Sequence, residues 1–442
     1  MKHSKILIIS ILLSLIFTPV NAESTKLLNL YKQAENYDTE IFAAQSAYLA
    51  ERENESIALA SALPKLNASV SSSRTNSNSD LQGNDTYKST SYSVSLSQSL
   101  INLPTWYTLS SSEQNSLRAE AVYLAAQQNL ILNVSSAYFN VLREEENLRS
   151  DQSQEAAVKR QYEQAKEQFD VGLIAVTDVH EAQASYDASQ TNRIRSEGNL
   201  TIAKVSLYRL TGTTINNLGA LKADFPITMD TSQGVEQWTE TASAHNLDIK
   251  IARFALKSLE KDLKSKRATH LPTLDLTANY SFNELSNAKT SIPDLTRPED
   301  EQSSISISLN VPIYSGGAVQ AGARQTRHLV EQARHQLIST QRQAEVDVKT
   351  EYINIKTNIQ TIEALKQNIV SHESALEATR EGYNVGTRNI VEVLNAERNY
   401  FTALKDYANA RFDFVESTLR IKRAVGTLNV KDLEELNAWF AS

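Results

Sequence analysis

The chain carries Phe169-Asp170-Val171-Gly172-Leu173-Ile174-Ala175-Val176-Thr177-Asp178-Val179 and repeats the pattern 214 residues later as Tyr383-Asn384-Val385-Gly386-Thr387-Arg388-Asn389-Ile390-Val391-Glu392-Val393. The same offset joins further pairs, such as Gly212 and Gly426, well outside this block. A pattern that returns in register at one fixed offset indicates an internal duplication. The predicted structural repeats are residues 23–229 and residues 230–442.

The first residues have the composition of an export signal. Lys2 and Lys5 precede the apolar run Ile6 to Phe17, and Ala22 supplies a small residue for cleavage. The run is too short for a comfortable membrane span, so we predict a removable signal peptide over residues 1–22. Removal leaves 42 basic side chains (44 minus two lysines) against 52 acidic ones, a net charge of −10, which disfavours nucleic acid as a partner.

The chain contains no cysteine, which excludes disulfides and a lipid on a cysteine after the signal. An exported protein of this kind either is soluble or enters a membrane as a β-barrel, whose sequence signal is weak in each strand. Composition alone leaves both options open.

Two predicted helices are unusually long. Neither Pro nor Gly occurs from Thr105 to Val171 or from Ala323 to Glu381, and roughly 65 helical residues would make a rod of about 100 Å. Four shorter helices are each expected to be about half as long, so that two halves stacked end to end accompany one rod. These half-length helices are predicted at residues 25–62, 178–210, 234–270 and 392–425.

Apolar residues recur at every seventh position in both rods, which predicts coiled-coil packing. The two seams are Leu117, Leu124, Ile131 and Tyr138, and Val348, Ile355, Ile362, Ile369 and Leu376. Heptads alone are equally typical of a soluble filament or stalk, so they do not settle the class of protein.

Strict alternation of apolar and small polar residues predicts two strand pairs, at about residues 65–98 and 273–313. A soluble β-sandwich would show the same alternation. Four strands, however, neither close a barrel nor supply a second sheet to cover their apolar face. We therefore expect several copies to share one barrel, with its polar face toward water and its apolar face toward lipid.

Two stretches resemble the TolC family of outer-membrane efflux proteins. They are Gly382-Tyr383-Asn384-Val385-Gly386-Thr387-Arg388-Asn389-Ile390-Val391-Glu392-Val393-Leu394-Asn395-Ala396 and Val311-Pro312-Ile313-Tyr314-Ser315-Gly316-Gly317. The resemblance extends over essentially the whole mature chain. It implies a mainly α-helical homotrimer with a 12-stranded β-barrel in the outer membrane and a 12-helix α-barrel crossing the periplasm. An equatorial girdle would then comprise residues 211–233 and 427–442.

The resemblance also implies a function. The protein would be the exit duct of tripartite efflux pumps or of type I protein secretion, opened at its periplasmic tip by a periplasmic adaptor (a membrane fusion protein) and an inner-membrane pump of the RND or ABC type. By resemblance, the adaptor would dock on two turns. Their residues are Val171, Gly172 and Leu173, and Val385, Gly386 and Thr387.

The sequence offers no candidate enzyme site or cofactor site. Its seven histidines are scattered, and none forms a pair with metal-ligand spacing beside an acid. The main alternative is a periplasmic coiled-coil adaptor or a structural stalk without a pore of its own. Against it, both the helical hairpin and the strand pair are duplicated, and no compact β-domain remains.

The tip turns have a local role of their own. Gly172 and Gly386 suit left-handed caps of the long helices, and Asn389 with Glu392 predicts a capping box. By resemblance, the tip would also be locked by hydrogen bonds between the two repeats. Tyr383 would bond Asp178, and Arg388 would bond Thr177 and Asp178.

Glu392 and Asn395 are expected to share one helix face and, under three-fold symmetry, to ring the pore at its constriction. Only one of the two positions is acidic, which predicts a cation-preferring entrance. By resemblance, Gln161 would bond a glutamate of the second repeat. That position holds Arg380 here, so this third link is not expected to form as in the family.

Overall fold

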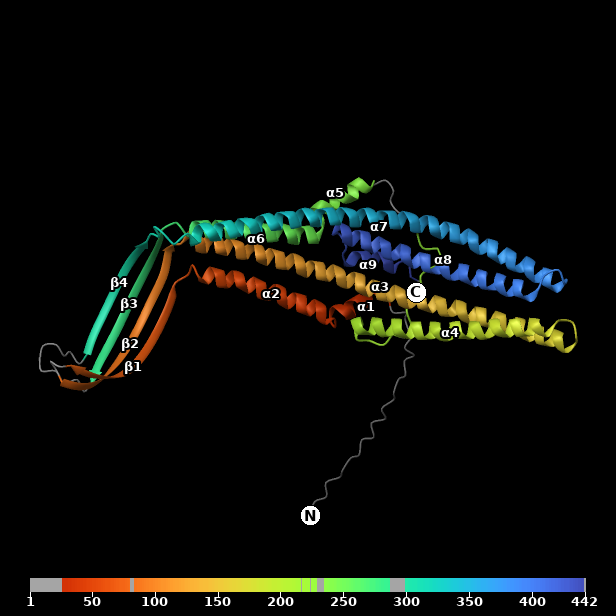
Figure 1. Ribbon diagram of the computed structural model, residues 1–442, viewed down its shortest axis with the longest axis horizontal. Helices are drawn as coiled ribbons and strands as arrows, with labels where there is room; N and C mark the ends of the chain where they lie inside the picture. The colour runs from red at the N-terminus through yellow and green to blue at the C-terminus, as the bar shows by residue number, and fades with distance from the viewer. Residues whose placement is uncertain are drawn as a thin grey trace, which may run out of the picture.

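A computed structural model describes residues 26–79, 83–215, 217–222, 224–228, 234–286 and 299–440. The predicted signal peptide lies outside the described residues, as do several residues of the predicted girdle. Figure 1 shows an elongated molecule, with one sheet at one end and a bundle of long helices that reaches the other end.

The two predicted rods are confirmed. α3 spans Leu103–Asp170 and α7 spans Ala318–Asn384, with 68 and 67 residues. Each would measure about 100 Å at 1.5 Å per residue. α3 begins with Asn102 as its cap, whose side chain accepts a hydrogen bond from the Thr105 amide.

The shorter helices stack in pairs beside the rods, as the sequence predicts. α2 (Thr39–Ala60) and α4 (Val176–Thr211) pack along the length of α3. In the same way, α6 (Leu247–Ala268) and α8 (Ile390–Val425) pack along α7. α3 also packs against α6 and α8, so the helices of the two predicted repeats lie side by side in one layer (Figure 1). In that layer α7 forms one open edge, and α2 with α4 forms the other.

Two of the half-length helices are broken, which corrects the prediction of single helices at 25–62 and 234–270. Short helices α1 (Leu27–Glu35) and α5 (Val235–His245) precede α2 and α6. Asp38 starts α2 by accepting a hydrogen bond from the Glu40 amide at 2.6 Å. Asn246 starts α6 in the same way, and its Nδ2 donates to the Ala424 carbonyl of α8 at 2.7 Å. Asparagine and aspartate compete with helical backbone bonds, which explains breaks at these residues.

The four strands form one antiparallel sheet in the order β1-β2-β3-β4, with β1 and β4 at its edges. Their bounds are Lys65–Ser79, Gly83–Ile101, Thr273–Ser286 and Glu299–Asn310. β4 ends before Pro312, which has no amide hydrogen for the ladder.

The strand register places apolar residues opposite one another across the whole sheet. The apolar pairs include Leu66 with Leu96, Val94 with Tyr280 and Leu276 with Ile307. Because side chains alternate between the faces of a strand, this register gathers the apolar residues on one face. Leu66 and Ile307 are both largely exposed in the single chain.

The two heptad seams differ in burial. In α7, Val348, Ile355 and Ile362 are at most 3% exposed, whereas in α3 Leu117 and Leu124 remain 40% and 41% exposed. The part of the α3 seam nearer the sheet, which contains Leu117 and Leu124, therefore lacks a complete packing partner within one chain.

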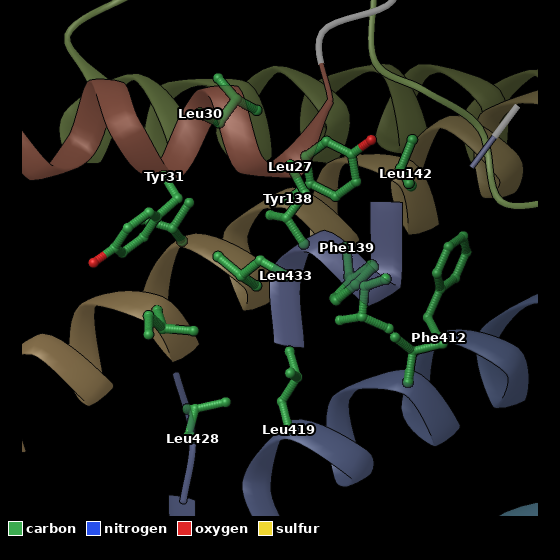
Figure 2. Close-up of a cluster of buried hydrophobic side chains, with 14 of the residues drawn as sticks. Leu27, Leu30, Tyr31, Tyr138, Phe139, Leu142, Phe412, Leu419, Leu428 and Leu433 are labelled. Atoms are coloured by element: carbon green, nitrogen blue, oxygen red, sulfur yellow. The ribbon is translucent and has the colours of Figure 1, made fainter. Parts of the chain in front are cut away.

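The main hydrophobic core lies at mid-length, where α1, α3, α8 and α9 (Val430–Asn437) meet (Figure 2). Tyr138 and Phe139 are fully buried there, and the Tyr138 hydroxyl donates to the Gly219 carbonyl at 2.8 Å. Segment 217–222 joins this core, since Leu221 pairs with Phe440. None of the helices in the described ranges has an apolar stretch long enough to span a membrane.

Candidate functional site

The end of the molecule farthest from the sheet is formed by two matching turns, α3–α4 and α7–α8 (Figure 1). Gly172 and Gly386 have φ values of 75° and 78°, which confirms the predicted left-handed caps. The Leu173 amide donates to the Gln168 carbonyl at 2.8 Å, and the Thr387 amide donates to the Gly382 carbonyl at 2.8 Å. Both turns are therefore Schellman motifs, and the duplication extends to their hydrogen bonds.

The turns present apolar side chains to solvent. Val171, Leu173 and Val385 are 71%, 74% and 73% exposed. Thr387 is exposed as well, and its hydroxyl donates to the Gly382 carbonyl. In the single chain these predicted docking residues keep their apolar surface in water, so the free energy that its burial would release is not used within the fold.

A second hydrophobic cluster holds the tip together. It brings Val158 and Ala165 of α3 against Ile390 and Val393 of α8, with Tyr383 of α7 packed on it. The two helical hairpins are thus in direct contact just above the turns.

The structure changes the predicted bond of Tyr383. Its hydroxyl donates to Oε1 of Gln168 at 2.9 Å, which ties α7 to α3, and it does not bond Asp178. Burial raises the pKa of Tyr383, and the charge of nearby Asp178 raises it further. Asp178 is therefore an electrostatic neighbour of this phenol, while Gln168 is its hydrogen-bond partner. Sequence reasoning missed Gln168, which lies in none of the quoted motifs.

The predicted bonds of Arg388 to Thr177 and Asp178 are also not formed. Its Nη1 lies 2.5 Å from Oε2 of Glu392, which is four residues along the chain, in the first turn of α8. Glu392 is only four residues from Arg388, so the two side chains can pair without fixing the position of another segment of the chain. This favours the pair with Glu392 over bonds to Thr177 and Asp178 in a single chain. The pair is substantially exposed, so it contributes little to stability.

Each predicted ring residue contacts an arginine within four residues of it along the chain. Glu392 pairs with Arg388, and Oδ1 of Asn395 accepts a hydrogen bond from Nη2 of Arg398 at 3.0 Å. Asn389 caps α8 by accepting a hydrogen bond from the Glu392 amide at 2.9 Å. The predicted capping box is only half formed, because the Glu392 carboxylate is engaged by Arg388.

Arg380 takes part in a buried ion pair that sequence reasoning did not predict. Its Nη2 lies 2.5 Å from Oε1 of Glu397, whose side chain is 0% exposed. Burial raises the pKa of Glu397, and the charges of Arg380 and Arg160 oppose that rise. Gln161, for which no link of the family's kind was expected here, lines a cavity of about 330 Å³ together with both arginines.

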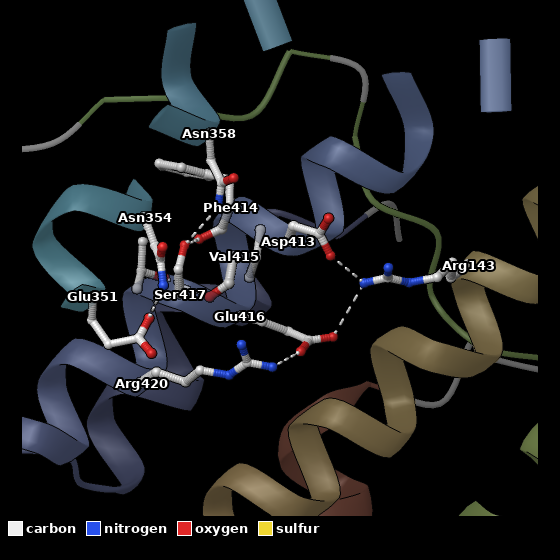
Figure 3. A network of polar contacts seen from close by, with 11 residues as sticks. Arg143, Glu351, Asn354, Asn358, Asp413, Phe414, Val415, Glu416, Ser417 and Arg420 are labelled. Atoms are coloured by element: carbon white, nitrogen blue, oxygen red, sulfur yellow. Dashed lines mark hydrogen bonds and ion pairs between the residues drawn. The ribbon is translucent and has the colours of Figure 1, made fainter. Parts of the chain in front are cut away.

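Two further polar clusters join α3 to α8 nearer the middle of the bundle. Asp151, 2% exposed, accepts from the Ser196 hydroxyl at 2.5 Å and pairs with Lys405. Arg143 pairs with Asp413 at 2.7 Å and with Glu416 at 3.5 Å (Figure 3). The contacts between the hairpins are therefore ionic as well as apolar.

The described part of the chain contains no group of three metal-ligating side chains that could hold an ion.

The fold and the tip define an elongated helical protein with one four-stranded antiparallel sheet at its end, and its family follows from comparison with known proteins. The profile described as "Outer membrane efflux protein" matches residues 30–213 and 238–427. The chain belongs to the outer membrane efflux protein family, and it is an outer-membrane protein.

Relatives within this family are similar over nearly their whole length. The outer membrane protein TolC of Vibrio cholerae is 32% identical over 99% of this chain and 98% of its own length. TolC of Escherichia coli is 34% identical over 94% of this chain and 85% of its own length. The proteases secretion protein PrtF of Dickeya chrysanthemi is 27% identical over 99% and 96% of the two chains.

The fold is also that of a solved channel. The crystal structure of the Campylobacter jejuni CmeC outer membrane channel matches with a TM-score of 0.78 at 18% identity, over 94% of this chain and 90% of that one. The relatives are channel and export proteins rather than enzymes.

Proposed function

We propose that the protein is a homotrimeric exit duct through the outer membrane, serving efflux pumps, type I protein secretion or both. The observation that carries the proposal is the pair of open edges in each layer. The outer edges of β1 and β4 pair with no other strand among the described residues, and the helical layer ends in α7 on one side and α2 with α4 on the other. A head-to-tail ring of three copies would cover all four edges.

In such a ring the sheets would form a 12-stranded barrel and the helices a 12-helix barrel. Support comes from the sheet register, which gathers apolar residues on one face where lipid would lie. Exposed apolar residues on the edge helices support a neighbouring copy in the helical layer: Val346 and Ile353 of α7 are 54% and 60% exposed, and Ile202 and Val205 of α4 are 66% and 62% exposed. The predicted girdle, residues 211–233 and 427–442, would surround the ring at the level of the main core.

The names of the relatives support the two kinds of cargo. TolC and CmeC are an outer membrane protein and an outer membrane channel, and PrtF is a protein of protease secretion. We propose a periplasmic adaptor and an inner-membrane pump as partners, with the adaptor bound at the exposed turns around Leu173 and Val385. No observation favours the alternative of a periplasmic adaptor or stalk.

We propose that the tip is a gate, locked by Tyr383 and Arg388 of the second repeat against Thr177 and Asp178 of the first. In the single chain Arg388 pairs with Glu392 instead, so this lock requires that Arg388 turn to Thr177 and Asp178 in the assembled ring. Gln168 joins this lock because its Oε1 accepts a hydrogen bond from the Tyr383 hydroxyl. The Glu392 and Asn395 side chains would line the constriction. Since one hydrogen bond is worth about 1 kcal/mol, three copies of a few bonds would give a lock on the order of 5 to 10 kcal/mol. A docking partner could supply that energy.

Single-channel conductance in planar bilayers tests the gate. Tyr383→Phe removes the hydroxyl with little change of shape, and we expect a higher conductance, increased further by Arg388→Ser. Tyr186→Phe is the matched control, because Tyr186 stacks on Tyr162 at 6.1 Å and its hydroxyl has no protein partner among the described residues. Wild-type conductance in the double variant would remove the lock from the proposal.

A further inference from the structure

A cavity of about 290 Å³ lies between α3 and α8, beside the short equatorial segment that includes Ala220 and Leu221. Its volume is near the lower end of the range for small-molecule sites, about 300–1,000 Å³. It lies between the two middle columns of the helical layer, away from the α7 edge and the α2–α4 edge where other copies would pack.

The cavity has an apolar side. Leu142 of α3 and Phe401, Leu404 and Phe412 of α8 contribute to its lining. Such a surface favours a hydrocarbon body, because transfer of apolar area from water is the main driving force of binding.

The other side of the cavity is cationic. Arg149, Lys405 and Arg411 line it, with Glu146 as the acidic lining residue. Arg149 is neutralised by Glu146 at 2.7 Å, and Lys405 is neutralised by the buried carboxylate of Asp151. Arg411 differs, since no ion pair within the described ranges involves it.

Arg411 is held in place without its charge being balanced. Its guanidinium lies 5.1 Å from the ring centre of Phe225 and 5.6 Å from that of Tyr407, and its Nη2 donates to the Lys222 carbonyl. Its Nε is shut off from solvent and has no hydrogen-bond acceptor among the described residues. A buried donor without a partner is costly, and a positioned guanidinium is well suited to bind a carboxylate or sulfate.

We propose that this cavity binds an amphiphilic anion, with its hydrocarbon body against Phe401 and Leu404 and its acidic head at Arg411. The ligand class is a medium-chain carboxylate, sulfate or sulfonate. The cavity size and the single unbalanced cation together favour one short chain with one negative head group. This site is separate from the tip, so it does not depend on the proposed gate.

The absence of cysteine from the chain allows a direct test. Ser153 lines the cavity and is exposed, so Ser153→Cys gives a single thiol at its mouth. The full-length protein is purified into nanodiscs, and the alkylation rate by N-ethylmaleimide is measured with decanoate, decanol or decyltrimethylammonium. Ser339→Cys is the matched control, because Ser339 lines a different surface hollow on α7.

We expect decanoate to slow alkylation at position 153 with an apparent Kd roughly tenfold lower than that of decanol, because a hydrogen bond to a charged group is stronger than one to a neutral group. Decyltrimethylammonium should give no protection, and the thiol at position 339 should react at the same rate with every additive. Equal protection by decanol, or equal protection at position 339, would overturn the proposal.

Two second-site variants separate binding from misfolding. Arg411→Gln removes the positive charge. Ala408→Glu places a carboxylate three residues from Arg411 on the same helix, where it can form an ion pair with the guanidinium. Each should abolish the preference for decanoate over decanol while the protein still inserts as wild type. Retention of that preference in both variants would exclude Arg411 as the anion site.

Discussion

Replacing Arg380 with methionine would leave the Glu397 carboxylate inside the tip without its nearest cation. The Glu397 side chain is 0% exposed, whereas that of Arg380 is 42% exposed. Breaking a buried pair by removing one partner costs about 3–5 kcal/mol. Because solvent reaches Arg380 and Arg160 still contributes, we expect about 3 kcal/mol, at the low end of that range.

Hydrogen exchange followed by mass spectrometry can measure this loss in peptides from the start of α8. Local opening sets the exchange rate there, and 3 kcal/mol corresponds to roughly 100-fold faster exchange after correction for intrinsic rates. The double variant Arg380→Met/Glu397→Leu should regain most of the protection, since an apolar pair replaces the ions. Arg334→Met on the same helix is the matched control, because its pair with Glu331 is half exposed and worth less than about 1 kcal/mol.

The effect should depend on pH in a defined direction. The pKa of Glu397 is raised in the folded protein by burial, and without Arg380 it should rise further. At low pH the carboxyl is neutral in both states. As pH rises above the unfolded pKa, only the unfolded state loses the proton, so stability falls until the folded pKa is passed. The variant should therefore be closest to wild type below the pKa of an unfolded glutamate, about 4.3. Wild-type exchange near pH 8, or a double variant no better than the single one, would refute the reasoning.

Further predictions concern the turns and the ring. Gly426→Ala should lower the thermal unfolding midpoint, followed by helical circular dichroism, more than Gly172→Ala does. Both glycines have a positive φ, which costs any other residue about 1–2 kcal/mol. Only at Gly426 would the added Cβ also collide with the carbonyl of His245. An equal shift would show that this contact has no effect. Glu392→Gln should weaken block of the channel by a trivalent cation about tenfold in bilayer recordings, because the ring loses its charge. Arg388→Gln should strengthen the block by freeing Glu392, and an unchanged block in both variants would remove Glu392 from the constriction.

Much of the fold could be read from local patterns. The rods α3 and α7 follow from long stretches without Pro or Gly, and the strands follow from strict alternation. The breaks before α2 and α6 were missed because Asp38 and Asn246 are unremarkable in a helical pattern until their side chains find backbone amides. The family resemblance correctly indicated an outer-membrane efflux protein, a conclusion that the matches over both repeats support.

The tip illustrates the limit of that approach. The glycine caps were predictable, since a left-handed residue at a helix end is a property of the local backbone. The partners of Tyr383 and Arg388 were predicted from resemblance and differ in this chain, because Gln168 and Glu392 lie within reach.

The order of residues alone fixed the duplication, the lengths of the helices, the strand positions and the turns, because each depends on backbone preferences and periodicity over a few neighbouring residues. Which side chains pair across the hairpins was settled only when helices distant in sequence came together. Glu397 with Arg380, Asp151 with Lys405 and the unbalanced Arg411 all belong to this second group. Burial and partner distance create their energetics, and neither quantity exists before the chain has folded.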